Sequence, residues 1–220
     1  MLAENTYRMG FHGITIGRCF ADKLITEFGM TLDSFKYGCD TTQYQRSDTS
    51  TRSGVVFYAG REKARRGYEL GLMALEVFAA RRPDVEVHIY GDKIGKLPFS
   101  FIDHGRVTTH ELNNIYNRCY AGLTLSFTNV SLVAYEMLAA GCIPVVNESL
   151  HIQTDLGSPF VHYSSPYPQA LASKLEEVIA TPDFDSLSRA AAASVRGGTW
   201  EDAGAAVDAI FQRTLNAVPV

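Results

Sequence analysis

The stretch AGLTLSFTNVSLVAYEMLAAGCIPVVN, residues 121–147, changes its hydrophobic pattern twice. Residues 121–127 are a short apolar run, which is typical of a buried strand. Residues 130–140 place apolar side chains three and four positions apart and stop at Gly141, as a helix does. Residues 142–147, CIPVVN, indicate a second strand. A strand, a helix and a strand in this order predict one unit of a parallel β-sheet.

The same alternation continues on both sides of this stretch. The predicted strands are short apolar or alternating runs, and the predicted helices place apolar residues at helical spacing. The further strands are expected at 54–60, 85–91, 99–107 and 160–163, and the further helices within 65–84, 109–119, 168–180, 185–196 and 200–215. The predicted fold class is therefore α/β, a Rossmann-like doubly wound parallel sheet. Such sheets bind ligands at the carboxyl ends of their strands, here near Gly60, Gly91, Phe127 and Asn147.

Residues 1–53 follow a different pattern. A strand and a helix are predicted within 13–30 and another strand within 31–38, whereas the polar residues 40–53 are typical of a linker. One strand-helix-strand unit is too small to fold well alone. Residues 1–53 are thus either an edge addition to the main sheet or the remnant of a second domain, and the main domain is predicted to span 54–220.

The composition narrows the classes of function. Hydrophobic residues make up 46% of the 220 residues and the net charge is −4, which argues against a general nucleic-acid binder. No apolar run of about 18 residues predicts a transmembrane helix, and the N-terminus lacks the pattern of a signal peptide. The four cysteines form no C-x-x-C pair, so we expect reduced thiols in a cytoplasmic protein.

A basic loop follows the predicted strand 54–60. The sequence GREKARRG (60–67) carries Arg61, Lys63, Arg65 and Arg66 between a strand and a helix. Cations beside a helix N-terminus suit a phosphate or diphosphate group, and a solvated charged loop is the simpler alternative. No G-x-G-x-x-G follows a strand, which weakens a dinucleotide interpretation.

Other polar residues have structural and chemical interpretations. Thr128, Asn129 or Ser131 is expected to cap the helix after residue 130, and the same turn offers free N–H groups to an anion. His104 and His110 each adjoin a carboxylate, but simple loop and cap roles account for both. No metal-binding motif is present, so no catalytic metal is predicted. Glu136 lies on an apolar helix face, which requires hydrogen-bond donors from the protein or from a ligand.

Taken in order, the segments resemble the C-terminal half of a retaining GT-B glycosyltransferase of glycosyltransferase family 4, with a rhamnosyltransferase-like character. The resemblance rests on YAGREKARRGYELGLMALEVF, HGRVTTHELNNIYNRC, LTLSFTNVSLVAYEMLAAGCIPVVN and the closing TWEDAGAAVDAIFQRTL. The segment ADKLITEFGM…KYGCD resembles the last helix and strand of the N-terminal domain of such enzymes. The resemblance implies that 1–53 is the remnant of an acceptor domain plus a linker, and that 54–220 binds a nucleotide-sugar donor.

The resemblance also implies roles for individual residues. Glu136 would accept hydrogen bonds from the ribose hydroxyls, Val107 would contact the base, and Arg61 and Arg66 would neutralise the diphosphate as catalytic residues. The turn of Asn129, Ser131 and Leu132 would meet the diphosphate through its backbone. Gly60 and Ser126 belong to the matching motifs. Thr128 stands eight residues before Glu136, where many family members have a glutamate near the donor sugar.

The implied function is metal-independent transfer of a sugar from a nucleoside-diphosphate sugar to a glycan or other acceptor, without a cofactor. Such an enzyme would act in polysaccharide biosynthesis, in the cytoplasm or peripherally at the inner membrane face. The acceptor would bind a missing N-terminal domain, so the chain alone is expected to be inactive. A nucleotide-sugar epimerase of the same fold, using His104 or His110, and a non-catalytic α/β binding module, favoured by Thr128, are the alternatives.

Overall fold

The computed structural model describes residues 2–216, without the side chains of Leu2 and Ala3. The described chain divides into two compact units. Unit 1 contains the described parts of residues 1–38, 150–157 and 198–220, and unit 2 contains residues 39–149 and 158–197. No helix within residues 2–216 is long and apolar enough to cross a membrane.

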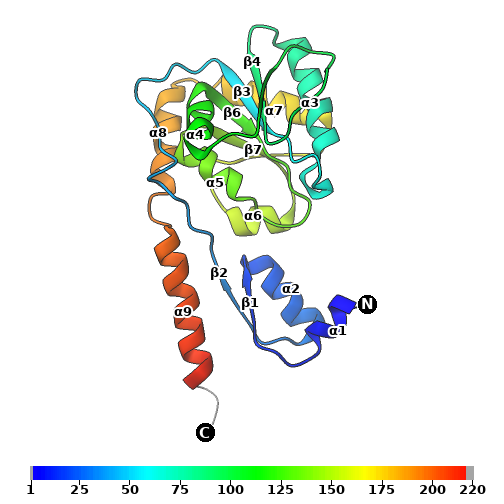
Figure 1. Cartoon of the computed structure of the whole chain (residues 1–220), viewed down its shortest axis with the longest axis vertical. Helices are drawn as coiled ribbons and strands as arrows, with labels where there is room; N and C mark the ends of the chain where they lie inside the picture. Colours follow the sequence, from blue (N-terminus) through cyan, green and yellow to red (C-terminus); the bar gives the residue numbers. More distant parts are fainter. Residues whose placement is uncertain (1, 217–220) are drawn as a thin grey trace. The chain divides into compact units, whose positions relative to one another are not determined.

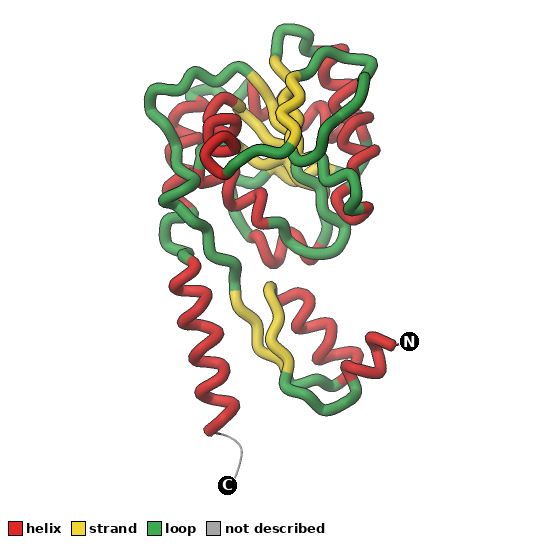
Figure 2. The backbone as a smooth tube through the Cα atoms, viewed as in Figure 1, coloured by secondary structure: helices red, strands yellow, loops and turns green. Residues whose placement is uncertain are grey.

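Unit 2 is built on a parallel sheet of six strands, drawn in yellow among the helices in Figure 2. The strands are β3 (Gly54–Tyr58), β4 (Glu86–Tyr90), β5 (Ile102–Gly105), β6 (Cys119–Leu123), β7 (Ile143–Asn147) and β8 (His162–Ser164). Their spatial order is β5-β4-β3-β6-β7-β8. The chain therefore winds outward in opposite directions from β3 and β6, and the loops after these two strands flank the switch point of the sheet.

Helices cover both faces of this sheet (Figure 1). They are α3 (Tyr68–Arg81), α4 (Thr109–Arg118), α5 (Leu132–Ala139), α7 (Pro168–Ile179) and α8 (Phe184–Ser194). Alternate residues of β3 face opposite layers, because Phe57 lies under Gly71 of α3 while Val56 packs with Met137 of α5 and Tyr116 of α4. The predicted α/β class, with a doubly wound parallel sheet, is confirmed.

Unit 1 joins segments that are far apart in the sequence. Strands β1 (Gly13–Ile16) and β2 (Leu32–Phe35) form a parallel pair, joined by α2 (Arg18–Phe28). Helices α1 (Leu2–Tyr7), α6 (Leu150–Leu156) and α9 (Trp200–Asn216) complete the unit. Asp155 of α6 accepts hydrogen bonds from the backbone N–H groups of Arg18 (2.7 Å) and Cys19 (3.0 Å), and so caps α2. The strand-helix-strand prediction is confirmed, whereas α1 and α6 were not predicted.

Residues 40–53, interpreted from sequence as a linker, pack into unit 2 with Cys39, and residues 39–53 form no helix or strand. Arg52 donates hydrogen bonds to the carbonyl oxygens of Tyr116 (3.0 Å), Ala140 (2.9 Å) and Cys119, and to the Ser188 hydroxyl (3.0 Å). The Asn117 side chain accepts from the backbone N–H of Ser47 at 2.7 Å. Residues 39–53 thus belong to the same compact unit as the six-stranded sheet.

Candidate functional site

The two loops at the switch point touch each other. The backbone N–H of Phe127, in the loop after β6, donates to the carbonyl oxygen of Arg65, in the loop after β3, at 2.9 Å. The Arg66 guanidinium donates to the Ser126 hydroxyl, also at 2.9 Å. Gly67 adopts a left-handed conformation (φ 60°), and a Cβ there would lie 2.8 Å from the Phe127 ring. The fold thus brings Arg66 and Ser126, two predicted site residues, into contact.

Asn147, at the end of β7, fixes the loop after β6. Its side-chain oxygen accepts from the Ser126 N–H at 2.7 Å, and its amide nitrogen donates to the Ser126 carbonyl oxygen at 2.9 Å. The Ser126 hydroxyl in turn donates to the carbonyl oxygen of Asn129 at 2.5 Å. Both Ser126 and Asn147 are buried. The side-chain amide of Asn147 therefore pairs with the backbone as a strand residue would, three residues beyond the end of β6.

The turn before α5 contains the remaining predicted anion-site residues. Ser131 is the N-cap residue, and its hydroxyl accepts from the Val133 N–H at 3.4 Å. Leu132 begins the helix and is half-buried. Thr128 and Asn129 are exposed, and the Thr128 hydroxyl donates to the Asn129 side-chain oxygen at 3.0 Å. The predicted cap is confirmed at Ser131, which leaves the hydroxyl of Thr128 and the amide of Asn129 on the surface.

The basic loop holds its cations in different environments. Arg66 is half-buried, and its side-chain stem lies 3.3 Å from the position that a Cβ on Gly60 would take. Arg61 is exposed, and its backbone N–H donates to the Asp92 carboxylate at 3.0 Å. Lys63 and Arg65 are exposed as well. Arg66 therefore lies next to both Gly60 and Ser126, whereas the side chain of Arg61 is exposed to solvent.

Glu136 lies on α5 beside a group of tyrosines. Within residues 2–216, the Tyr116 hydroxyl is the one group that donates a hydrogen bond to its carboxylate, over 3.5 Å. Burial raises the pKa of Glu136 from its ordinary value to about 7, and the Tyr116 hydrogen bond opposes this rise. The carboxylate also contributes to the raised pKa values of Cys39 and Tyr44, where burial is the main cause. The hydrogen-bond donor that we expected for Glu136 from the sequence is thus the Tyr116 hydroxyl, at a distance typical of a weak hydrogen bond.

Val107 belongs to the same neighbourhood as Glu136. It packs against a core cluster of Val56, Tyr90, Leu112, Ile115, Tyr116, Cys119, Met137, Ala140 and Cys142, together with Tyr44, Tyr58 and Val133. Helix α5 links this region to the two loops, because Glu136 follows the cap residue Ser131 by about one and a half turns, or roughly 7–8 Å. The Glu136 carboxylate and the capped turn at Ser131 therefore lie on the same helix.

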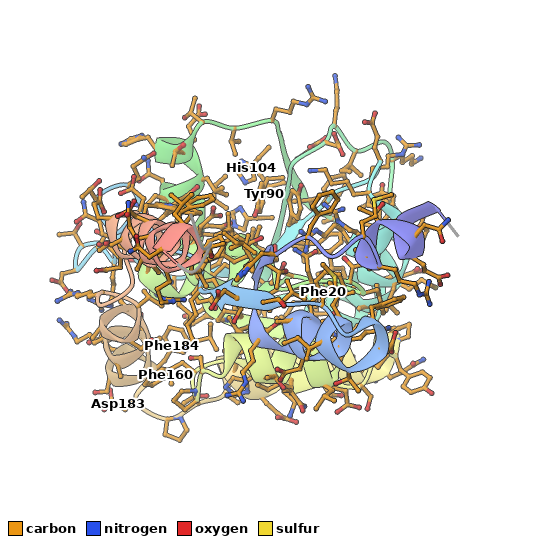
Figure 3. All side chains as sticks on the ribbon, turned by 90° about the horizontal axis from the view of Figure 1, so that it is seen from below. Phe20, Tyr90, His104, Phe160, Asp183 and Phe184 are labelled. Carbon is orange, nitrogen blue, oxygen red and sulfur yellow. The ribbon has the colours of Figure 1, made fainter. Side chains whose placement is uncertain are left out.

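The two histidines with neighbouring carboxylates have structural partners. The Nε2 atom of His104 lies 2.9 Å from Nδ1 of buried His88, and His88 Nε2 lies 3.2 Å from the Glu86 carboxylate. Figure 3 labels His104 and Tyr90, which come from the neighbouring strands β5 and β4. Burial lowers the pKa of His88 and of His104 and favours their neutral forms. Glu111, next to His110, forms a capping box with Thr108.

Several residues around Glu136 could not be recognised from the sequence as part of a site. Tyr116 has the helical spacing of a core residue, and nothing in the pattern shows that its hydroxyl reaches Glu136 across 20 positions. Tyr44 comes from the polar segment 39–53, and its ring centroid lies 6.1 Å from that of Tyr116. All four cysteines are free thiols, and Cys39, Cys119 and Cys142 are buried. The described residues contain no group of three or more side chains suited to hold a metal ion.

Comparisons with known proteins agree on the fold. The structure resembles sucrose-phosphate synthase from Thermosynechococcus elongatus, with a TM-score of 0.81 and 14% identity over 99% of this chain and 62% of that chain. It resembles Anabaena HepE in complex with UDP and glucose, with a TM-score of 0.75 and 15% identity over 99% and 66% of the chains. The pneumococcal O-GlcNAc transferase GtfA, in complex with UDP and GlcNAc, has a TM-score of 0.70 and 12% identity over 92% and 45%.

This chain therefore spans less than two thirds of each of these structures, and at these identities the likeness shows the fold alone. A search of curated protein sequences gave no match. A family model described as "WsaF, C-terminal domain" matches residues 53–176, which is more than half of the chain. The chain thus belongs to the WsaF C-terminal domain family and has the fold of the C-terminal domain of GT-B glycosyltransferases.

Proposed function

We propose that unit 2 is the donor-binding domain of a glycosyltransferase that moves a sugar from a nucleoside-diphosphate sugar to a glycan or other acceptor. The observation that carries this proposal is the contact between Arg66 and Ser126 at the switch point, beside the N-terminus of α5. A helix N-terminus and a guanidinium group are both suited to bind a diphosphate. Two of the similar structures are complexes with UDP and a sugar, which supports the same class of ligand.

The diphosphate would lie between the two loops. Arg61 and Arg66 would supply positive charge, and the backbone of Asn129, Ser131 and Leu132 would supply N–H donors. As the bond to the sugar breaks, negative charge grows on the leaving diphosphate, and fixed donors stabilise that charge without reorganising. These residues provide the required charge themselves, so the proposed reaction is independent of a metal.

The nucleoside would lie toward Glu136 and Val107. The Glu136 carboxylate has one weak protein donor and room in its hydrogen bonding for two ribose hydroxyls. Val107 would contact the base. Thr128 would lie near the donor sugar and offer a hydroxyl where a carboxylate is common, which fits a deoxy sugar that needs fewer polar contacts.

The finer assignments rest on the sequence resemblance. They are membership of glycosyltransferase family 4, a rhamnosyltransferase-like donor, and a cytoplasmic or membrane-peripheral role in polysaccharide synthesis. The acceptor would be held by a domain outside this chain. Because catalysis requires both substrates in register, residues 1–220 alone should transfer sugar far below an enzyme-like rate.

Calorimetric titration of residues 1–220 with UDP, dTDP, GDP and their glucose or mannose esters tests the proposal. At least one nucleotide should bind, and Glu136→Gln should weaken it roughly ten- to a hundredfold, because hydrogen bonds to a charged group are lost. Glu177→Gln, at an exposed position of α7, is the matched control and should not change the affinity. Absence of binding by every nucleotide, or equal affinities of wild type and Glu136→Gln, would overturn the assignment.

A non-catalytic nucleotide-binding module is the second candidate, and the exposed Thr128 favours it. Incubation of the full-length protein with the bound donor and candidate acceptors separates the two functions. Transfer products support the enzyme, and binding without any product supports the module. An epimerized nucleotide sugar would instead identify the epimerase alternative.

A further inference from the structure

A chain of hydrogen bonds leads from the core of unit 2 to Glu136. The Tyr90 hydroxyl, on β4, lies 2.6 Å from the Tyr116 hydroxyl, on α4, and the latter lies 3.5 Å from Oε2 of Glu136, on α5. Tyr116 is 0% exposed and Tyr90 is 4% exposed, so both hydroxyls depend on protein partners. Three elements thus converge on one oxygen of the carboxylate.

The chemistry of these groups gives the chain a direction. An ionised carboxylate only accepts hydrogen bonds, so the Tyr116 hydroxyl must donate its single proton to Glu136. The Tyr116 oxygen can then only accept from Tyr90, which must donate to it. Both protons therefore point toward Glu136 when it is ionised. This arrangement occupies Oε2 and leaves Oε1 without a protein donor among the described residues.

We propose that Tyr116, backed by Tyr90, is a positioning residue that holds the Glu136 carboxylate in its ionised form and aims its free oxygen at the ligand. This inference rests on the proposed nucleotide-binding function. Tyr116 would touch neither the nucleotide nor the sugar and would act only through Glu136.

Glu136 changes between its protonated and ionised forms near neutral pH. Burial raises its pKa to about 7, and the Tyr116 hydroxyl is the group that lowers it. The other titratable groups that interact with it are Tyr90, Tyr44 and Cys39, whose own pKa values are raised, so they stay uncharged near neutrality. Since 3.5 Å is the outer limit of a hydrogen bond, Tyr116 offsets the effect of burial only in part.

Nucleotide affinity should depend on the ionisation of Glu136. Ribose hydroxyls donate to the ionised carboxylate, so affinity should rise as the pH increases through about 7. Removal of the Tyr116 hydroxyl leaves the effect of burial unopposed and raises the pKa of Glu136 further. The pH midpoint of binding should therefore move upward in Tyr116→Phe, although the aromatic ring and its packing are retained.

Carbon-13 NMR titration of the Glu136 carboxyl group in ligand-free residues 1–220 gives the first readout. We expect an upward shift of the midpoint in Tyr116→Phe and a smaller upward shift in Tyr90→Phe, which leaves the Tyr116 hydroxyl in place but unsupported. Tyr120→Phe is the matched control, because its ring packs on Phe184 of α8 and is not a member of the Tyr90–Tyr116–Glu136 chain. If neither Tyr116→Phe nor Tyr90→Phe moves the midpoint, the proposed positioning role is wrong.

Affinity for a nucleoside-diphosphate sugar such as UDP-glucose, between pH 6 and 9, gives the second readout. The sugar ester is used because a terminal phosphate titrates near 6, as in UDP, and would obscure the profile. Tyr116→Phe should lose roughly two- to tenfold in affinity at pH 7 and recover at pH 9. In the Glu136→Gln background, the profile should be flat and Tyr116→Phe should add no further loss.

The two proposals fail in different ways. If Glu136→Gln leaves the affinity unchanged, or no nucleotide sugar binds, the proposed function is wrong, and the inference about Tyr116 is wrong as well. If Glu136→Gln weakens binding while Tyr116→Phe changes neither the carbon titration nor the pH profile, only the inference fails. Circular dichroism of each variant shows whether the fold is retained, and Tyr90→Phe supplies the test if Tyr116→Phe does not fold.

Discussion

Unit 2 contains two mostly buried charged side chains, and they differ in how many hydrogen bonds the protein provides to each. Arg52, before the amino end of β3, donates to three carbonyl oxygens and one hydroxyl. Glu136, on α5, receives one hydrogen bond from the groups of residues 2–216, over 3.5 Å. A buried charge is costly unless it is fully paired. The first charge thus stabilises the fold, whereas the second lacks hydrogen bonds that a ligand can supply.

The largest effect expected from this comparison is the loss of stability in Arg52→Ala. Truncation leaves the carbonyl oxygens of Tyr116, Cys119 and Ala140 without this donor, and should cost about 3 kcal/mol or more of unfolding free energy. Urea denaturation of residues 1–220 measures the loss. Arg81→Ala, at an exposed arginine on α3, is the control and should cost less than about 1 kcal/mol. Similar losses in both variants would remove the contrast on which the comparison rests.

The second effect is a gain of stability in Glu136→Gln above neutral pH. The folded-state pKa of about 7 exceeds the ordinary value near 4.3, so the folded protein binds more protons between these values. The contribution of Glu136 to stability is therefore fully present below about pH 4 and is lost as the pH rises through 7. Denaturation at pH 8 should show Glu136→Gln more stable than wild type by up to about 3 kcal/mol. A gain that is the same at pH 4 and pH 8 would contradict the raised pKa.

The third effect concerns the basic loop. Arg66→Ala should weaken the binding of a nucleoside diphosphate about tenfold, or 1.4 kcal/mol, while binding of the corresponding nucleoside should change little. Arg61→Ala should act in the same direction. Arg65→Ala is the matched control, since its carbonyl oxygen, which the substitution retains, is the group that contacts the loop after β6. Calorimetry with both ligands distinguishes a phosphate contact from a general loss of folding, which would weaken them equally.

The smallest effect is expected at Gly67. Alanine there is strained at φ 60°, and its Cβ would press on the Phe127 ring, so the two loops must separate slightly. We expect a loss of about 1 kcal/mol of stability and a weaker nucleotide affinity. Gly197→Ala, where no atom lies within 4 Å of the added Cβ, is the control. An unchanged affinity in Gly67→Ala would show that the contact between the loops does not shape the site.

Much of the fold was predictable because each strand and helix of unit 2 carries its own periodic pattern. The ends of the strands were harder to predict, because a buried apolar run has no alternating pattern that marks where strand pairing stops. Residues 121–127 were predicted as a strand, yet β6 spans Cys119–Leu123 and the rest of that run is loop. The side chain of Asn147 replaces a strand partner there, and no local pattern reveals this.

The candidate site was predictable to a similar degree. Parallel topology alone places the loops after β3 and β6 side by side, so the meeting of Arg66 and Ser126 follows from the strand order. The lone carboxylate of Glu136 on an apolar helix also stood out. Its tyrosine partner did not, and neither did the packing of Arg52 into unit 2, because both depend on contacts between segments that are far apart in the sequence.

The two hydrogen bonds between Asn147 and Ser126 have a consequence for the entropy of binding. A loop that must become ordered around its ligand loses conformational freedom at the moment of binding, and each immobilised side chain costs about 0.5–1.5 kcal/mol. Here the buried amide of Asn147 already holds the backbone of Ser126 as a strand would, and Ser126 holds the carbonyl oxygen of Asn129. That entropic cost is met when the protein folds, so an anion arriving at this turn would encounter donors that are already in place.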